Sequence, residues 1–233
     1  MRSWTKPVPH VEVRWPWYLA VDVSHSMRGK RLQVVEATLP ALLDVLEDAV
    51  VEDATRLLAM LEFAGTARLV APLDVLNRLR RLPGITASGG STSFGGLFGL
   101  LRELLARDVR LLHADGYRVL RPVLLLLTDG ETADEWEAQF YELTEYDSER
   151  RVGFPWYPIV LPIGVLPDAY SDLDALSFPP GRVPTRPVIG ADDAVQVVTT
   201  FLQRFRPEPL PTWRGDVAFG HGHGGQPVTD DFS

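Results

Sequence analysis

Short, almost unbroken apolar runs alternate along this chain with longer segments whose apolar residues recur every three or four positions. The apolar runs lie at residues 17–23, 57–63, 67–70, 123–128 and 157–163. Runs of this length, flanked by Gly, Pro and Asp, are typical of strands buried on both faces, as a parallel sheet requires. The segments with the amphipathic periodicity of helices are 32–46, 94–105, 136–143 and 194–205.

Strands that alternate with helices of this size predict βαβ units, and therefore an α/β fold with a doubly wound, mostly parallel sheet. The runs at 57–63 and 67–70 are joined by only three residues. Such a link is too short for a crossover, so we expect this pair to form an antiparallel hairpin at one edge. The proline-rich last third has room for a short edge strand around 182–188.

The chain has 233 residues, which is enough to bury a substantial core within one large α/β domain. We expect this domain to cover 16–206, after an N-terminal extension at 1–15. From residue 207 to 233 the sequence is rich in Pro, Gly and His, and we expect a flexible tail there. The chain contains no cysteine, which excludes disulfides, thiol catalysis and cysteine-ligated zinc.

The charge of the chain limits its partners. Its 31 acidic residues against 23 lysines and arginines give a formal net charge of −8. Phosphate backbones would repel such a chain, so we do not expect nucleic acid as a partner. The apolar runs are much shorter than the roughly 20 residues of a membrane-spanning helix, and the N-terminus lacks the apolar core of a signal peptide. We therefore expect a cytoplasmic protein that makes no membrane contact.

Oxygen-bearing side chains follow two of the predicted buried strands. Asp22 lies in the first apolar run, and Ser24 and Ser26 follow at alternate positions. Since every second side chain of an extended segment points to the same side, one carboxylate and two hydroxyls converge there. Asp129 follows the run at 123–128. Ligands of open parallel sheets bind at the carboxyl ends of strands, near the switch in strand order, so we expect Asp129 to face Asp22.

A third source of oxygen ligands is the loop at 88–93, which precedes the helix predicted from residue 94. Its glycines allow a close approach of the backbone, and the helix presents free N–H groups. All of these ligands are hard oxygens, which favours Mg²⁺, with Mn²⁺ or Ca²⁺ as alternatives, over zinc or copper. The two carboxylates only partly neutralise the ion, so an Asp or Glu of a protein partner could complete the site.

Three segments carry a family resemblance: Asp22-Val-Ser24-His-Ser26-Met27, Gly90-Ser-Thr92 and Thr128-Asp129-Gly130. In order and spacing they resemble the metal-ion-dependent adhesion site (MIDAS) of von Willebrand factor A (vWA) domains. The resemblance implies a Rossmann-like six-stranded sheet ordered 3-2-1-4-5-6, with helices on both faces and one antiparallel edge strand. It implies that Ser24 and Ser26 ligate the metal directly. Thr92 would do so directly or through water, and Asp22 and Asp129 mainly through water.

The segments 89–95 and 122–130, with Asp134 and Trp136 just after them, particularly resemble the bacterial TerY group, which is linked to tellurite-resistance gene clusters. This resemblance implies a non-enzymatic, cation-dependent interaction module in an intracellular stress-response complex. The surrounding loops would supply the specificity for the partner.

The same residues have alternative interpretations. No lysine follows the glycines at 89–96, which argues against a phosphate-binding P-loop. An Asp after the first strand can also be a phosphoryl acceptor, so the alternative function is a metal-dependent phosphohydrolase-like enzyme that uses Asp22. Phosphatases of that kind usually carry a second Asp two residues later, where this chain has Ser24. A domain that keeps the fold without using its metal is a third alternative.

Overall fold

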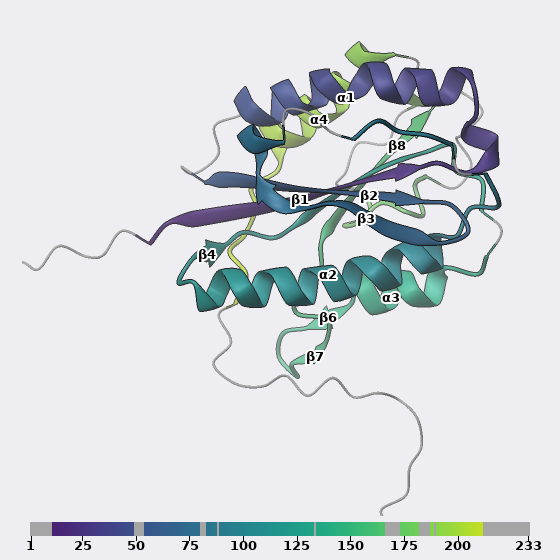
Figure 1. Ribbon diagram of the computed structural model, residues 1–233. Coiled ribbons are helices and arrows are strands. Elements are labelled where there is room, and N and C mark those ends of the chain that lie inside the picture. Colours follow the sequence, from purple (N-terminus) through teal and green to yellow (C-terminus); the bar gives the residue numbers. More distant parts are fainter. Residues whose placement is uncertain are drawn as a thin grey trace, which may run out of the picture.

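The centre of the molecule is a mostly parallel sheet with helices on both faces (Figure 1). The computed structural model describes residues 11–48, 54–79, 83–87, 89–132, 134–165, 173–181, 187–188 and 190–211. In chain order, the strands of the sheet are β1 (Val13–Asp22), β2 (Thr55–Phe63), β3 (Ala67–Val75), β4 (Arg118–Val119), β5 (Val123–Thr128), β8 (Ile159–Val165) and β9 (Pro187–Val188). They lie in the order β3-β2-β1-β5-β8-β9, and β4 pairs with the start of β1.

The predicted α/β class and mostly parallel sheet are confirmed. β2 and β3 form the expected antiparallel edge hairpin, while β1 is parallel to both of its long neighbours, β2 and β5. With β4 set aside, the strand order is the expected 3-2-1-4-5-6. β4 was not predicted, because two residues are too few to form a periodic pattern.

In the described part of the chain, two helices cover each face of the sheet. One face carries α1 (Lys30–Asp48) and α4 (Ala191–Arg204), and the other carries α2 (Phe94–Ala114) and α3 (Glu137–Thr144) (Figure 1). The shorter elements are the 3-10 helices η1 (His25–Met27) and η2 (Leu76–Arg78) and the hairpin strands β6 (Tyr146–Asp147) and β7 (Val152–Gly153).

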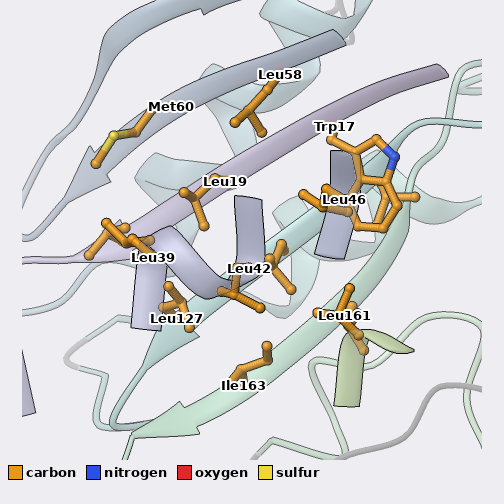
Figure 2. Close-up of a cluster of buried hydrophobic side chains, with 14 of the residues drawn as sticks. Trp17, Leu19, Leu39, Leu42, Leu46, Leu58, Met60, Leu127, Leu161 and Ile163 are labelled. Atoms are coloured by element: carbon orange, nitrogen blue, oxygen red, sulfur yellow. The ribbon is translucent and has the colours of Figure 1, made fainter. Parts of the chain in front are cut away.

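The sheet separates two apolar cores. Because side chains alternate along β1, Trp17 and Leu19 join the core next to α1 and α4, whereas Tyr18 joins the core next to α2. Figure 2 shows the first core, in which Leu39 and Leu42 of α1 pack over the strands. Each fully buried leucine of this kind contributes about 1.5–3 kcal/mol to the free energy of folding. The two cores therefore hold the strands, and with them the strand ends, in fixed positions.

The folded body extends beyond the expected limits of 16 and 206. β1 begins at Val13, and the fully buried Trp15 donates a hydrogen bond from Nε1 to the carbonyl of Arg121 at 3.0 Å. At the other end, Leu210 is buried, and its N–H donates to the carbonyl of Val119 at 2.8 Å. The rest of the expected extension and tail, 1–10 and 212–233, lies outside the described residues.

Two further expectations concern the last third and the membrane. β9 lies within the short edge strand expected around 182–188, of which 182–186 lie outside the described residues. Among the helices that the structure describes, none is long and apolar enough to span a bilayer.

Candidate metal centre

The candidate site lies where the carboxyl ends of β1 and β5 meet. β1 continues into α1 on one face of the sheet, whereas the chain reaches β5 through α2 on the other face, so the strand order switches between them. The last paired residues are Val21 and Leu127, which places Asp22 beside Thr128. Parallel sheets bind ligands in the crevice at such a switch point.

Asp22, on the β1 side of the crevice, is fully buried and both of its carboxylate oxygens accept hydrogen bonds. Oδ1 accepts from the N–H of Ser24 at 2.9 Å, and Oδ2 accepts from Oγ1 of Thr128 at 2.8 Å. The hydroxyls of Ser24 and Ser26 lie 3.0 Å apart. The structure therefore brings this carboxylate and the two hydroxyls together, but not by the predicted alternation of an extended chain, because β1 ends at Asp22 and Ser26 lies in η1.

The glycine loop forms a second wall and is fixed by backbone hydrogen bonds. The N–H of His25 donates to the carbonyl of Gly90 at 3.1 Å, and the N–H of Ser93 donates to the carbonyl of Ala64 at 2.8 Å. Gly90 has a φ of +94°, which favours glycine. The loop places Thr92, which is 5% exposed, in the lining of the crevice.

Asp129, on the β5 side, is as buried as Asp22 but is bonded differently. Its Oδ1 accepts from the N–H of Glu131 at 3.3 Å. Its Oδ2 is buried and receives no hydrogen bond from any residue that the structure describes. The guanidinium of Arg31 forms an ion pair with this oxygen, with Nη1 at 3.5 Å. One carboxylate oxygen in the crevice is therefore left without a hydrogen-bond donor.

The carboxylate of Asp134 joins the two loops. Its Oδ2 accepts from Oγ of Ser93 at 2.7 Å and from the N–H of Gly95 at 3.0 Å. Its Oδ1 accepts from Oγ1 of Thr132 at 2.6 Å and from the N–H of Phe94 at 3.2 Å. Burial alone would raise the pKa of Asp134, but these hydrogen bonds outweigh it and hold the pKa below its ordinary value. Asp134 thus caps the start of α2 and fixes the glycine loop against the loop after β5.

Two carboxylates are buried at neighbouring strand ends, and this makes it unfavourable for both to be ionised. Burial raises the pKa of Asp22 from 3.8 to about 6, the nearby charge of Asp129 adds to the rise, and the hydrogen bonds from Ser24 and Thr128 oppose it. A bound cation would relieve this cost by favouring the ionised form.

A cavity of about 290 Å³ opens next to these groups. It is lined by His25, Ser26, Gly90, Ser91, Thr92, Glu131 and Thr132. A larger cavity of about 610 Å³ lies beside α3, and Thr132 and Asp134 contribute to its lining. The smaller cavity gives a ligand access to Ser26 and Thr92 of the candidate site, whereas Ser24 does not line it.

All five residues predicted as metal ligands therefore lie around one crevice. The structure joins Asp22 to Ser24 and Ser24 to Ser26 by direct contacts, and it places Thr92 in the same lining as Ser26. Among the described residues there is no group of three or more His, Cys, Asp or Glu side chains that could hold a metal. The donors are instead three hydroxyls and two carboxylates, a set that suits hard cations.

The sequence did not reveal the roles of Asp134 and Arg31. An acidic residue close to a helix start is a usual capping signal, and this signal could have identified the role of Asp134. Arg31 carries no comparable signal, because a charged residue on a helix is most often solvated.

No family model matches the sequence, and no curated protein matches it. Solved structures do match the fold. An aerotolerance-related membrane protein from Bacteroides fragilis is 16% identical with a TM-score of 0.55, over 82% of this chain and 99% of that one. A vWA structure from Catenulispora acidiphila is 14% identical with a TM-score of 0.52, over 80% of this chain and 41% of that one.

Proximal thread matrix protein 1 (PTMP1) from the mussel byssus, solved with a zinc-occupied MIDAS motif, is 15% identical with a TM-score of 0.58. That match covers 85% of this chain and 48% of PTMP1, so the chain spans about half of that relative. At such identities the similarity establishes the fold: the chain adopts the Rossmann-like fold of vWA domains. None of these structures supports the resemblance to the TerY group in particular.

Proposed function

We propose that this domain is a divalent-cation-dependent protein-interaction module that binds an acidic side chain of a partner. The observation that carries the proposal is Oδ2 of Asp129, which is buried and receives no hydrogen bond within the described chain, since Nη1 of Arg31 forms only an ion pair with it at 3.5 Å. Buried carboxylate oxygens nearly always have a donor. A cation, or water bound to a cation, would satisfy this oxygen at the end of the sheet where ligands of such folds bind.

The residues that would hold the cation are the five predicted from the sequence. The hydroxyls of Ser24, Ser26 and Thr92 are neutral donors, and Asp22 and Asp129 supply the two negative charges. The hard-oxygen set favours Mg²⁺, with Mn²⁺ or Ca²⁺ as alternatives. The zinc-occupied motif of PTMP1 is a reason to include Zn²⁺ in the tests. When bound, the cation would supply an electrophilic centre with room for a carboxylate oxygen of the partner.

The chain's own residues would orient that contact. The hydrogen bonds to Asp22 from Ser24 and Thr128 hold its carboxylate in one orientation. Asp134 accepts hydrogen bonds from Ser93 and from Thr132, and we call this link between the two loops the latch. It keeps the loop of Thr92 against the loop of Asp129. The cavity of about 290 Å³ is at the lower limit for pockets that bind small molecules, and it suits the entry of a single side chain.

The geometry gives little support to the alternative phosphohydrolase-like enzyme. An attacking carboxylate must reach the phosphoryl group, but Asp22 is 0% exposed and both of its oxygens accept hydrogen bonds. The position two residues later holds Ser24, which cannot act as the general acid near neutral pH. We therefore propose a binding module and no enzymatic activity.

The setting of this module is also a proposal. The resemblance of 89–95 and 122–130 to the TerY group favours a bacterial, cytoplasmic stress-response complex of the tellurite-resistance type. The genes that flank this one test the setting, because neighbours unrelated to such complexes would contradict it.

Titration with Mn²⁺ at pH 7.5 tests the metal-dependent function, with free Mn²⁺ followed by electron paramagnetic resonance. We expect one site per chain in the wild type and its loss in the double variant Ser24→Ala/Ser26→Ala. Ser91→Ala is the matched control, because Ser91 lines the cavity but is not a proposed ligand. Absence of Mn²⁺ binding in the wild type, or equal binding in the double variant, would contradict the proposal. Phosphoester turnover that requires Asp22 would favour the alternative enzyme.

A further inference from the structure

Arg31 is a cation that belongs to the crevice itself. It lies in the first turn of α1, and its Nη1 donates to the carbonyl of Ser26 at 2.9 Å. The same atom is 3.5 Å from Oδ2 of Asp129, the oxygen that has no hydrogen-bond donor in the described structure. The side chain of Arg31 is 23% exposed and that of Asp129 is 0% exposed, so water screens this pair only in part.

The position of Arg31 is not one that helix stability favours. The start of a helix carries partial positive charge, so acidic residues stabilise it and basic ones do not. The first turn of α1 instead begins with Lys30 and Arg31, whereas that of α4 contains Asp192 and Asp193. In addition, Nε of Arg31 is buried and has no hydrogen-bond partner among the described residues. The contacts with Ser26 and Asp129 are thus the interactions that account for its placement.

The charges at the crevice do not balance once a divalent cation is added. Asp22 and Asp129 contribute two negative charges, and Arg31 contributes one positive charge. Asp134 at the start of α2 and Arg28 against Gly89 have opposite charges, so they cancel in this sum. A divalent cation would therefore leave an excess of one positive charge, and one carboxylate from outside would neutralise it. Glu131 and His25 line the same cavity but are exposed, so water screens them more strongly.

We propose that Arg31 determines the specificity of the site by making it require an external carboxylate. This inference rests on the proposed function. Arg31 weakens the binding of the cation alone, because the two cations share Asp129. It strengthens the binding of a carboxylate to the loaded site, because the excess positive charge attracts an anion. Cation and acidic partner therefore bind cooperatively, and each raises the affinity for the other by the same factor.

Arg31→Gln removes the charge of this residue but keeps a side-chain amide that can donate to Ser26. With Mn²⁺ at pH 7.5 and low ionic strength, we expect it to bind the cation about tenfold more tightly than the wild type. The carboxylate probe is acetyl-glutamate amide, and its binding to the Mn²⁺-loaded protein is followed by the relaxation of water protons. We expect this binding to weaken about tenfold in Arg31→Gln. Acetyl-glutamine amide is the neutral control ligand.

Two control variants test whether the loss of charge at Arg31, and not another consequence of the substitution, changes the two affinities. Arg31→Lys keeps the charge, and Lys30→Gln makes the same change in charge at the exposed neighbouring position of α1. Both should resemble the wild type in both measurements. Arg31→Met repeats the loss of charge without the amide, so it decides the outcome if Arg31→Gln does not fold.

The two affinities must change in opposite directions in the neutral variants. Mn²⁺ affinities that are unchanged or weaker in Arg31→Gln and Arg31→Met would overturn the role of Arg31, and so would an unchanged affinity for acetyl-glutamate amide. Failure of the wild type to bind Mn²⁺ would contradict the proposed function itself, so the two failures are distinguishable.

Discussion

The loops after β1 and after β5 both begin with a buried Asp at the end of a parallel strand, yet they use this residue differently. In the loop after β1, both oxygens of Asp22 accept hydrogen bonds, from Ser24 and from Thr128. In the loop after β5, Asp129 accepts one long hydrogen bond and leaves Oδ2 without a donor in the described structure. The carboxylate of Asp22 is thus held by two hydrogen bonds within the protein, whereas Oδ2 of Asp129 can still accept one.

The difference has a local cause. After β1 the chain turns into η1, so that the N–H of Ser24 points back to the carboxylate of Asp22. After β5 the chain turns at Gly130, whose φ is +84°, and its N–H donates to Oγ1 of Thr128 instead of to Asp129. The hydroxyl of Thr128 in turn donates to Asp22, so it stabilises the carboxylate at the end of β1 and not that of Asp129. One strand end thus carries a carboxylate that is fixed by two hydrogen bonds, and its neighbour carries a carboxylate with one oxygen that has no donor in the described structure.

The largest expected effect is the loss of Mn²⁺ affinity when the charge of Asp129 is removed. Asp129→Asn keeps the shape of the side chain but removes its charge, so we expect the affinity for Mn²⁺ to fall about 100-fold. Loss of this charge removes the ion pair with Arg31 but also the repulsion of Asp22, so we expect the free energy of unfolding without metal to change by less than about 1 kcal/mol. Metal titration and urea unfolding in chelator measure the two quantities. A variant that still bound Mn²⁺ as the wild type does would remove the distinction between the two loops.

We expect the carboxylate of Asp22 to make the affinity for the cation depend on pH. Since the pKa of Asp22 is raised to about 6 in the metal-free protein, Asp22 becomes protonated as the pH falls below that value. The cation must then displace a proton, so we expect its affinity to fall by up to about tenfold per pH unit below pH 6. Between pH 7 and 8, where Asp22 is ionised, the affinity should be nearly constant. Isothermal calorimetry with Mg²⁺ across this range measures the dependence, and a constant affinity down to pH 5 would contradict it.

A smaller effect is expected at the latch between the loops. Asp134→Ala removes the acceptor of four hydrogen bonds, including the cap of α2, so we expect a loss of about 1–3 kcal/mol in the free energy of unfolding. The Mn²⁺ affinity should fall about tenfold, because the latch positions the loops of Thr92 and Asp129.

Asp147→Ala is the matched control for the latch. Asp147 accepts from the N–H groups of Glu149 and Arg150 in the exposed turn between β6 and β7, which is not part of the crevice. We expect this variant to lose some stability and to keep its Mn²⁺ affinity. An equal loss of affinity in both variants would show that general destabilisation, and not the latch, is responsible.

The sequence predicts the parts of this molecule that rest on regular periods. The mostly parallel sheet follows from the alternation of buried strands and helices, and the β2–β3 hairpin follows from its three-residue link, whereas the strand order is what the family resemblance implies. The contact between Ser24 and Ser26 was expected from a two-residue period, but Ser26 lies in η1, so the turn after β1 produces it instead. The parts that it does not predict depend on contacts between distant positions. The hydrogen bond of Leu210 to Val119 joins residues that carry no pattern. The ion pair of Arg31 with Asp129 joins the first turn of α1 to the loop after β5, and only the folded chain determines the directions of these side chains.

The most direct test of the account is a crystal structure of the protein with Mn²⁺, with the anomalous signal of manganese used to locate the ion. We expect one site at the carboxyl ends of β1 and β5, bordered by the hydroxyls of Ser24, Ser26 and Thr92 and by Oδ2 of Asp129. The ion should be accompanied by a water or an added carboxylate. A map without manganese in this crevice, at a concentration that saturates any site seen in solution, would contradict the central claim.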